Sequence, residues 1–291
     1  MVHNGACCRC LLLVLVTGEG DFIYASNNPP GRSMKSRLKR RKQKRAHAIE
    51  AVDAGFPVLR NAEIAAAVAG RRKSGDFYDS IRVSPSRVLF GLLDLADRRK
   101  QHEELRSKAQ RVFREVGGKL LRDPEANESE ALAELCLQLN RSIIETASSV
   151  HSSPAFAGCY NEYLGTVCYF NAGHTPGLVL HATDVSELAA TGLPLGLFSH
   201  TTSDSQMIVL EPGAALLLVS RAVDEAKRQG EEFGLHRVEE TLRSARPANA
   251  HELCALVLDA MHRFAPAEHE DTTALALIRS VANEATPSGP G

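Results

Sequence analysis

Apolar and polar positions follow two periods along this chain, and their order predicts its fold. Short apolar or alternating runs indicate strands, and apolar residues repeated at helical spacing indicate helices. The expected elements are strands at 61–69 and 87–93, helices at 96–121 and 127–147, strand pairs across 155–219, helices at 235–245 and 250–264, and a strand at 274–278. Because strands and helices are grouped rather than strictly alternating, an α+β fold with helices packed on sheets is predicted.

Two of these segments carry additional signals. Ala214–Val219 is apolar at every position, which suits a strand buried on both faces. Asn127 can cap the helix at 127–147, where Glu128 and Glu130 favour the positive end of the helix dipole. From Arg221 onward the pattern also turns helical.

Charge is distributed unevenly along the chain. The net charge is −1, yet the stretch from Arg32 to Arg45 holds nine of the 34 basic residues and no acid. The remaining 25 basic residues face 35 acidic ones, a balance of −10, which argues against nucleic-acid binding by the globular part. The basic run itself has three interpretations: a solvated helix continuing through Ala46–Val52, a contact with an anionic membrane or nucleic acid, or a docking surface. Stacking aromatics are missing from it, which disfavours nucleic acid.

Tryptophan is absent and aromatic residues make up 5% of the chain, so we expect a core of Leu, Val, Ile and Ala. The seven cysteines show no paired spacing of the kind that zinc requires, and an odd count in a chain of 291 residues fits a reducing compartment. A cytoplasmic location is therefore expected. Four cysteines are expected to be small core residues: Cys136, Cys159, Cys168 and Cys254.

The N-terminal segment allows two interpretations. Cys10–Val16 is apolar and superficially resembles a signal peptide, but it is too short to span a bilayer. Alternatively, residues 1–33 are disordered or a miscalled extension, with Met34 as the working start; we favour this interpretation. The predicted division is an extension with a basic segment at 1–45, one domain at 46–281 and a disordered tail at 282–291.

Three motifs lie at fixed spacing in the second half of the chain. They are Tyr169–Gly177 (YFNAGHTPG), Thr191–Leu197 (TGLPLGL), and Leu210–Gly213 (LEPG) running into Leu216–Ser220. His174 in the first motif is interpreted as a turn residue making one backbone hydrogen bond, because no second histidine lies at metal-ligand spacing.

This series of motifs resembles the SpoIIE-like branch of the PPM-type metal-dependent protein phosphatases, over about residues 60–280. The resemblance implies a four-layer α-β-β-α sandwich of two antiparallel sheets flanked by helices. It also implies hydrolysis of phosphoserine and phosphothreonine with two Mn²⁺ or Mg²⁺ ions, which suit carboxylate ligands and activate water.

The resemblance assigns site residues one by one. Gly75–Asp79 (GDFYD) matches the element whose first aspartate bridges two ions, so Asp76 is a candidate catalytic residue and metal ligand, and Asp94 at the end of the next strand is another. Glu270 and Asp271 resemble a later ligand pair. The family's Ser-Asp-Gly element is Ser220-Arg221-Ala222 here, which places a permanent cation where an anionic ligand belongs. The glycines that usually follow the second aspartate are also missing after Asp94.

Two functions follow as hypotheses. The first is a phosphatase domain with a weakened site, holding one Mn²⁺ or Mg²⁺ ion on Asp76 and Asp94 and acting on a phosphoserine of a regulatory protein. The second is an inactive pseudophosphatase in which the guanidinium of Arg221 takes the place of a metal and pairs with Asp76 or Asp94. A phosphoprotein substrate or signalling partner is expected in both, without nucleic acid or a transmembrane segment, and a homodimer stays open.

Overall fold

The fold is built from two antiparallel sheets, seen in a computed structural model that describes residues 49–52, 55–70, 76–95, 101–147, 152–182, 184–199, 203–245, 247–266 and 272–281. All of these lie within one compact unit, Ala46–Gly291. The first sheet, called the β10 sheet, has the order β1 (Ile49–Val52), β2 (Ala62–Ala69), β13 (Thr272–Arg279), β10 (Ala215–Val219), β7 (Gly177–Leu180) and β8 (Val185–Leu188). The second, called the β4 sheet, has the order β3 (Asp76–Ser84), β4 (Arg87–Asp94), β5 (Ala155–Asn161), β6 (Thr166–Ala172) and β9 (Gln206–Val209).

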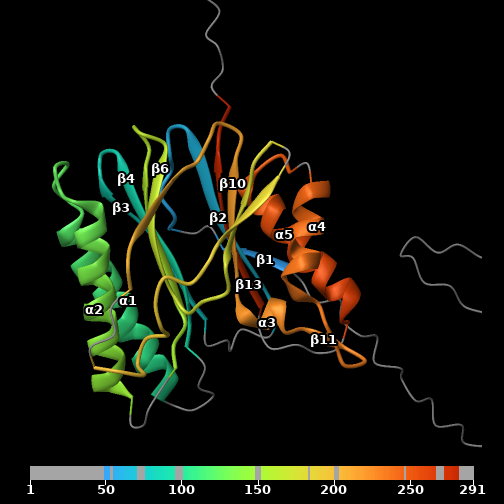
Figure 1. Cartoon of the computed structure of the whole chain (residues 1–291), viewed down its shortest axis with the longest axis horizontal. Coiled ribbons are helices and arrows are strands. Elements are labelled where there is room, and N and C mark those ends of the chain that lie inside the picture. Colours follow the sequence, from blue (N-terminus) through green and yellow to red (C-terminus); the bar gives the residue numbers. More distant parts are fainter. Residues whose placement is uncertain are drawn as a thin grey trace, which may run out of the picture. The chain divides into compact units, whose positions relative to one another are not determined.

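Helices cover the outer face of each sheet (Figure 1). On the β4 sheet lie α1 (Gln101–Leu120) and α2 (Glu128–Thr146), and on the β10 sheet lie α4 (Gly234–Ser244) and α5 (Ala250–Phe264). The short helix α3 (Arg221–Asp224) and a small hairpin of β11 (Lys227–Arg228) and β12 (Glu231–Glu232) connect β10 to α4. The four-layer α-β-β-α sandwich predicted from the sequence is confirmed.

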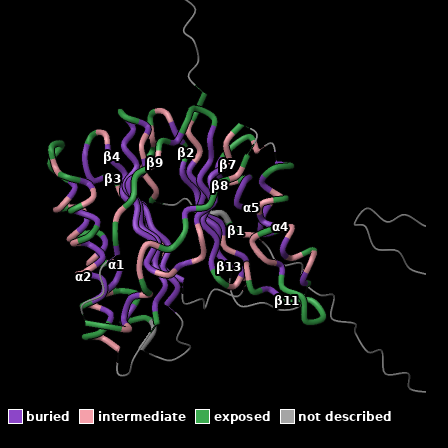
Figure 2. The backbone as a smooth tube through the Cα atoms, in the orientation of Figure 1, coloured by how far each residue is buried: buried purple, intermediate pink, exposed green. Residues whose placement is uncertain are grey.

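Strand β10 shows why its sequence is apolar throughout. Leu216 and Leu218 point between the sheets, whereas Leu217 and Val219 point toward α4 and α5. Side chains alternate along a strand, so a strand covered on both faces needs apolar residues at every position. Figure 2 shows this burial running through the centre of both sheets.

The two faces of the β10 sheet differ in side-chain size. On the inner face, Leu275 and Leu277 of β13 meet aromatic residues of the β4 sheet, among them Phe90 and Phe156. On the outer face, the same strand presents Ala274 and Ala276 to α5. The small alanine side chains let α5 lie close to the sheet. On the inner face, burial of each leucine side chain stabilises the fold by roughly 1.5–3 kcal/mol.

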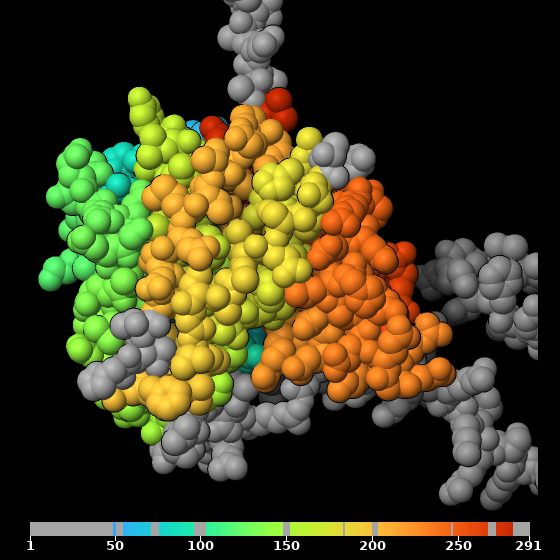
Figure 3. All heavy atoms as spheres, viewed as in Figure 1, coloured from blue at the N-terminus to red at the C-terminus, as the bar shows by residue number. Residues whose placement is uncertain are grey.

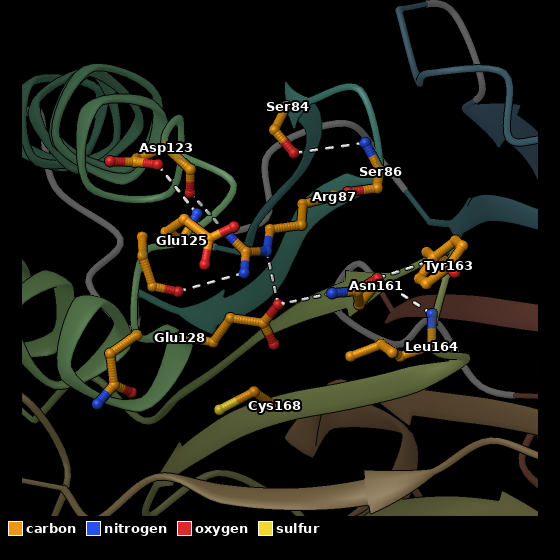
Figure 4. A network of polar contacts seen from close by, with 12 residues as sticks. Ser84, Ser86, Arg87, Asp123, Glu125, Glu128, Asn161, Tyr163, Leu164 and Cys168 are labelled. Carbon is orange, nitrogen blue, oxygen red and sulfur yellow. Dashed lines mark hydrogen bonds and ion pairs between the residues drawn. The ribbon is translucent and has the colours of Figure 1, made fainter.

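A buried polar network fastens α2 to the β4 sheet (Figure 4). The Arg87 side chain pairs with Glu128 at 2.6 Å and also donates to the carbonyl oxygens of Asp123 and Ala126. Glu128 accepts a second hydrogen bond, 3.0 Å long, from the Asn161 side chain. The first turn of α2 is therefore tied to β4 and β5, and Asn127 caps it through the backbone amides of residues 129 and 130.

Several local predictions are confirmed and one is wrong. Helix α5 has the predicted bounds, and Cys136, Cys159, Cys168 and Cys254 are buried free thiols. The helix expected to continue through Ala46–Val52 is wrong, because Ile49–Val52 is a strand that pairs with β2. The expected core of Leu, Val, Ile and Ala is confirmed, since these residue types make up most of the buried hydrophobic side chains. It also contains fully buried aromatic residues, among them Tyr160, Tyr169, Phe77, Phe90, Phe113, Phe156 and Phe170.

Other predictions fall on residues that are not described. The basic run at Arg32–Arg45, the N-terminal extension and the tail at 282–291 all lie outside the described residues, so the predicted domain boundaries stay predictions. Within the described part of the chain, none of the helices is both long and apolar enough to cross a membrane.

Candidate active site at the mouth of the sandwich

The two candidate aspartates lie side by side at one end of the β4 sheet. Asp76 is the first residue of β3, Asp94 is the last of β4, and the two are paired directly across the strands. Phe77 and Leu93, their neighbours in sequence, point toward α1 and α2. By alternation, both carboxylates therefore point to the inner face, into the mouth between the two sheets.

The β10 sheet contributes the residues that face these aspartates. The hydroxyl of Thr273, in β13, donates to Asp76 Oδ2 over 2.9 Å. Ser220, at the end of β10, accepts from the Thr273 backbone amide through its own hydroxyl and donates its backbone amide to the Thr273 carbonyl. These bonds fix the position of the Thr273 hydroxyl and through it one oxygen of Asp76.

Arg221 follows Ser220 directly and reaches across the mouth. Its Nε lies 3.3 Å from Asp94 Oδ2 and 3.7 Å from Glu225 Oε1, so the guanidinium pairs with the second candidate aspartate. The Arg221 side chain is 49% exposed, whereas the Asp94 side chain is 11% exposed. The cation is thus open to solvent on one side and neutralises a buried carboxylate on the other.

His174 lies near Arg221, in the turn that crosses from β6 to β7. It is buried, and its Nδ1 lies 3.0 Å from the Thr175 carbonyl oxygen, the single backbone contact predicted for the ring. Burial lowers the pKa of His174 to about 4; the hydrogen bond to Thr175 opposes this shift and the charge of Arg221 adds to it. The ring is therefore neutral near pH 7. Since a carbonyl only accepts, Nδ1 carries the proton.

Gly173 makes this turn possible. Its φ is +67°, and a Cβ there would lie 2.5 Å from the ring of Pro194. Glycine is therefore needed both for the left-handed conformation and for the close approach of the loop at 191–197.

The structure brings together Asp76, Asp94 and Arg221, while Glu270 and Asp271 lie outside the described residues. Among described residues there is no group of three or more His, Cys, Asp or Glu that could hold a metal ion. Two adjacent carboxylates with water fit one hard divalent ion, but Arg221 disfavours a second ion beside Asp94. The predicted site residues did not include Thr273, although its position just after Glu270, Asp271 and Thr272 was a usable signal.

Residues from both halves of the chain meet on one face of the molecule. In Figure 3, a small teal surface from the part of the chain that holds β3 and β4 shows between the yellow and orange surfaces of the second half of the chain. The two halves of the chain therefore meet on this face, and the ion pair between Asp94 and Arg221 also joins them.

The family is shown by comparison with known proteins. The model described as Stage II sporulation protein E (SpoIIE) matches residues 108–280, more than half of the chain. The chain therefore belongs to the SpoIIE family of PPM-type phosphatase domains. The matched range includes Arg221 but begins after Asp76 and Asp94. A search of curated proteins found no match.

Solved structures agree with the fold. The RsbU and RsbW domains of Rv1364c from Mycobacterium tuberculosis are 20% identical with a TM-score of 0.61, covering 78% of this chain and 64% of that chain. The PP2C phosphatase domain with a regulatory fragment of SpoIIE from Bacillus subtilis is 16% identical with a TM-score of 0.62, covering 77% and 63%. RsbX in complex with magnesium is 10% identical with a TM-score of 0.53, covering 80% and 100%. The chain spans less than two thirds of the first two structures, and such identities show the fold alone.

Proposed function

We propose that this domain acts on a phosphoserine or phosphothreonine of a regulatory protein and hydrolyses it slowly, with one Mn²⁺ or Mg²⁺ ion. The observation that carries the proposal is the position of Asp76 and Asp94, adjacent and facing the mouth, with Arg221 on Asp94. Asp76 and Asp94 would hold the ion, with Glu270 and Asp271 as further candidate ligands. The ion would supply an activated water and neutralise phosphoryl oxygens.

The chain's own residues have separate roles in this proposal. Thr273 restrains one oxygen of Asp76, so that the carboxylate keeps its orientation without substrate. Arg221 has two opposing effects: its exposed side attracts a phosphoryl group, and its charge weakens cation binding at Asp94. The three charged side chains sum to −1, compared with −3 for an aspartate in place of Arg221, which is why turnover is slow.

A second candidate function is favoured by one observation, the ion pair between Arg221 and Asp94. If this pair excludes the ion entirely, the domain is a pseudophosphatase that binds a phosphoprotein as an interaction module in a partner-switching pathway. Both candidates share the phosphoprotein partner and differ in turnover alone.

Hydrolysis of a generic phosphate ester with Mn²⁺ separates the two candidates. We expect slow metal-dependent turnover that Asp76→Asn abolishes, and that Arg221→Asp raises at least about tenfold, equivalent to about 1.4 kcal/mol in the barrier. Arg243→Asp is the matched control, because Arg243 is 47% exposed and also paired with acids, Asp184 and Glu239, but belongs to α4.

Each outcome assigns one function. No turnover in the natural chain, with recovery in Arg221→Asp, assigns the pseudophosphatase. Full metal-dependent turnover in Asp76→Asn would show that the reaction takes place elsewhere and would refute both proposals for this site. Equal gains in Arg221→Asp and Arg243→Asp would show that net charge, rather than the ion pair at Asp94, limits turnover.

A further inference from the structure

Two large apolar side chains are exposed on one short loop at the active-site end of the molecule. Leu193 is 55% exposed and Phe198 is 59% exposed, within six residues of each other. Figure 1 shows this part of the chain, drawn yellow to gold, passing the lower end of α2. Isolated exposed apolar residues are ordinary, but two in one loop beside a candidate site indicate a binding surface.

The loop is held firmly, so the exposure of these side chains is built into the fold. Asn140 of α2 is fully buried and uses both ends of its carboxamide on the loop. It donates to the Phe198 carbonyl at 2.9 Å and accepts from the Gly196 amide at 2.7 Å. Leu195, which lies between Leu193 and Phe198 in the sequence, is fully buried and exchanges two backbone hydrogen bonds with Ser153. A buried amide committed to a loop fixes its conformation.

Backbone hydrogen bonds also set the separation of this loop from the candidate site. The Asp94 amide donates to the Pro154 carbonyl, and Ser153, one residue earlier, pairs with Leu195. Asp94 and Leu195 are therefore separated by two strand-to-strand distances, about 10 Å in total. Leu193 and Phe198 stand two and three residues from Leu195 along the loop. An extended peptide therefore reaches this loop from Asp94 in about three residues, at about 3.3 Å each.

We infer that Leu193 and Phe198 form a docking surface, the Leu193/Phe198 rim, for an apolar residue about three positions from the phosphoresidue of the partner. The inference rests on the proposed function and adds a sequence preference to it. Charge complementarity supports this occupant, because the half-exposed Arg221 guanidinium offers a contact for the phosphate while the rim offers an apolar one. A phosphopeptide with one apolar side chain at that spacing engages both.

The test measures binding of fluorescent nine-residue peptides to the full chain by fluorescence anisotropy. Metal is first omitted, so that the phosphopeptide is not hydrolysed, and the measurement is then repeated with Mg²⁺. One peptide carries a central phosphoserine with leucine three positions before and after it. A second replaces both leucines by serine, and unphosphorylated copies of both complete the set. The rim variant is Leu193→Ser with Phe198→Ser. The control variant is Tyr163→Ser with Leu164→Ser, two residues that are 87% and 58% exposed in the β5–β6 turn at the opposite end of the sheet.

We expect the natural chain and the control variant to bind the leucine phosphopeptide about tenfold more tightly than the serine phosphopeptide. The rim variant should lose this difference and keep its dependence on phosphate. Equal affinities for the two phosphopeptides in the natural chain overturn the inference, as does a leucine advantage that survives in the rim variant.

The remaining outcomes identify which statement fails. Absence of any phosphate dependence, in every variant, overturns the proposed function and this inference with it. Phosphate-independent binding of the leucine peptide overturns the link between the rim and the phosphate site. A concentration-dependent dimer in sedimentation, lost in the rim variant, assigns the rim to a second copy of the chain and overturns the inference too.

Discussion

Replacing His174 should change how the stability of the domain depends on pH. The ring is buried, Nδ1 donates to the Thr175 carbonyl, and Nε2 has no hydrogen-bond partner among the described residues. Protonating Nε2 would place a second cation near Arg221 in a buried position. We expect His174→Asn to remove this penalty, because asparagine offers a similar N–H donor and does not titrate.

The magnitude follows from the pKa of His174, which is lowered from 6.5 to about 4 in the folded protein. The unfolded chain therefore binds a proton that the folded protein rejects, and stability falls as the pH decreases from about 6.5 toward about 4. Between about pH 7 and about pH 5, this group alone should cost the natural chain about 2 kcal/mol. His174→Asn lacks that loss, whatever its stability at pH 7.

The assay is urea unfolding of both proteins at several pH values, followed by intrinsic tyrosine fluorescence or circular dichroism. The quantity to compare is the difference between the two proteins, because every other titrating group is common to them. Parallel stability curves from about pH 7 to about pH 5 would refute the reasoning, since they would mean that His174 titrates near its ordinary pKa in the folded state.

Two further predictions concern the framework around the site. Arg87→Met should destabilise the domain by about 3–5 kcal/mol, because it leaves the buried Glu128 carboxylate unpaired, and the double variant with Glu128→Leu should recover much of that loss in thermal unfolding. A loss of under about 1 kcal/mol in the single variant would contradict the buried-pair argument. Gly173→Ala should cost about 1–3 kcal/mol, since residue 173 has φ of +67° and its Cβ would meet Pro194. Gly118→Ala, where a Cβ meets nothing in α1, is its control and should be neutral or stabilising.

The pattern of apolar and capping residues predicted those helix bounds that depend only on residues a few positions away. The bounds of α5 and the capping of α2 by Asn127 were predictable, because caps and helical spacing act within a few residues. The hairpin of β11 and β12 was missed, because its residues are exposed and carry no apolar alternation. Its hold on α4 comes from Arg237, which donates to the carbonyls of Glu232 and Phe233.

The segment Ala46–Val52 shows how context overrides pattern. The basic run before it predicts a solvated helix that continues through Ala46–Val52, yet Ile49–Val52 extends the β10 sheet beside β2. Strand formation depends on a partner edge, which no window of local sequence contains.

The amino-acid sequence by itself determined the family, the sandwich of two sheets, and the presence of a cation at position 221 where an acid would hold a metal. The tertiary structure decided which aspartate that cation meets, because Asp94 and Arg221 lie 127 positions apart and come together only when the two sheets pack. It also decided that Thr273 restrains Asp76 and that Leu193 and Phe198 stay exposed. The physical reason is the same in each case: these contacts join elements distant in sequence, and their geometry is set by the packing of one sheet on the other.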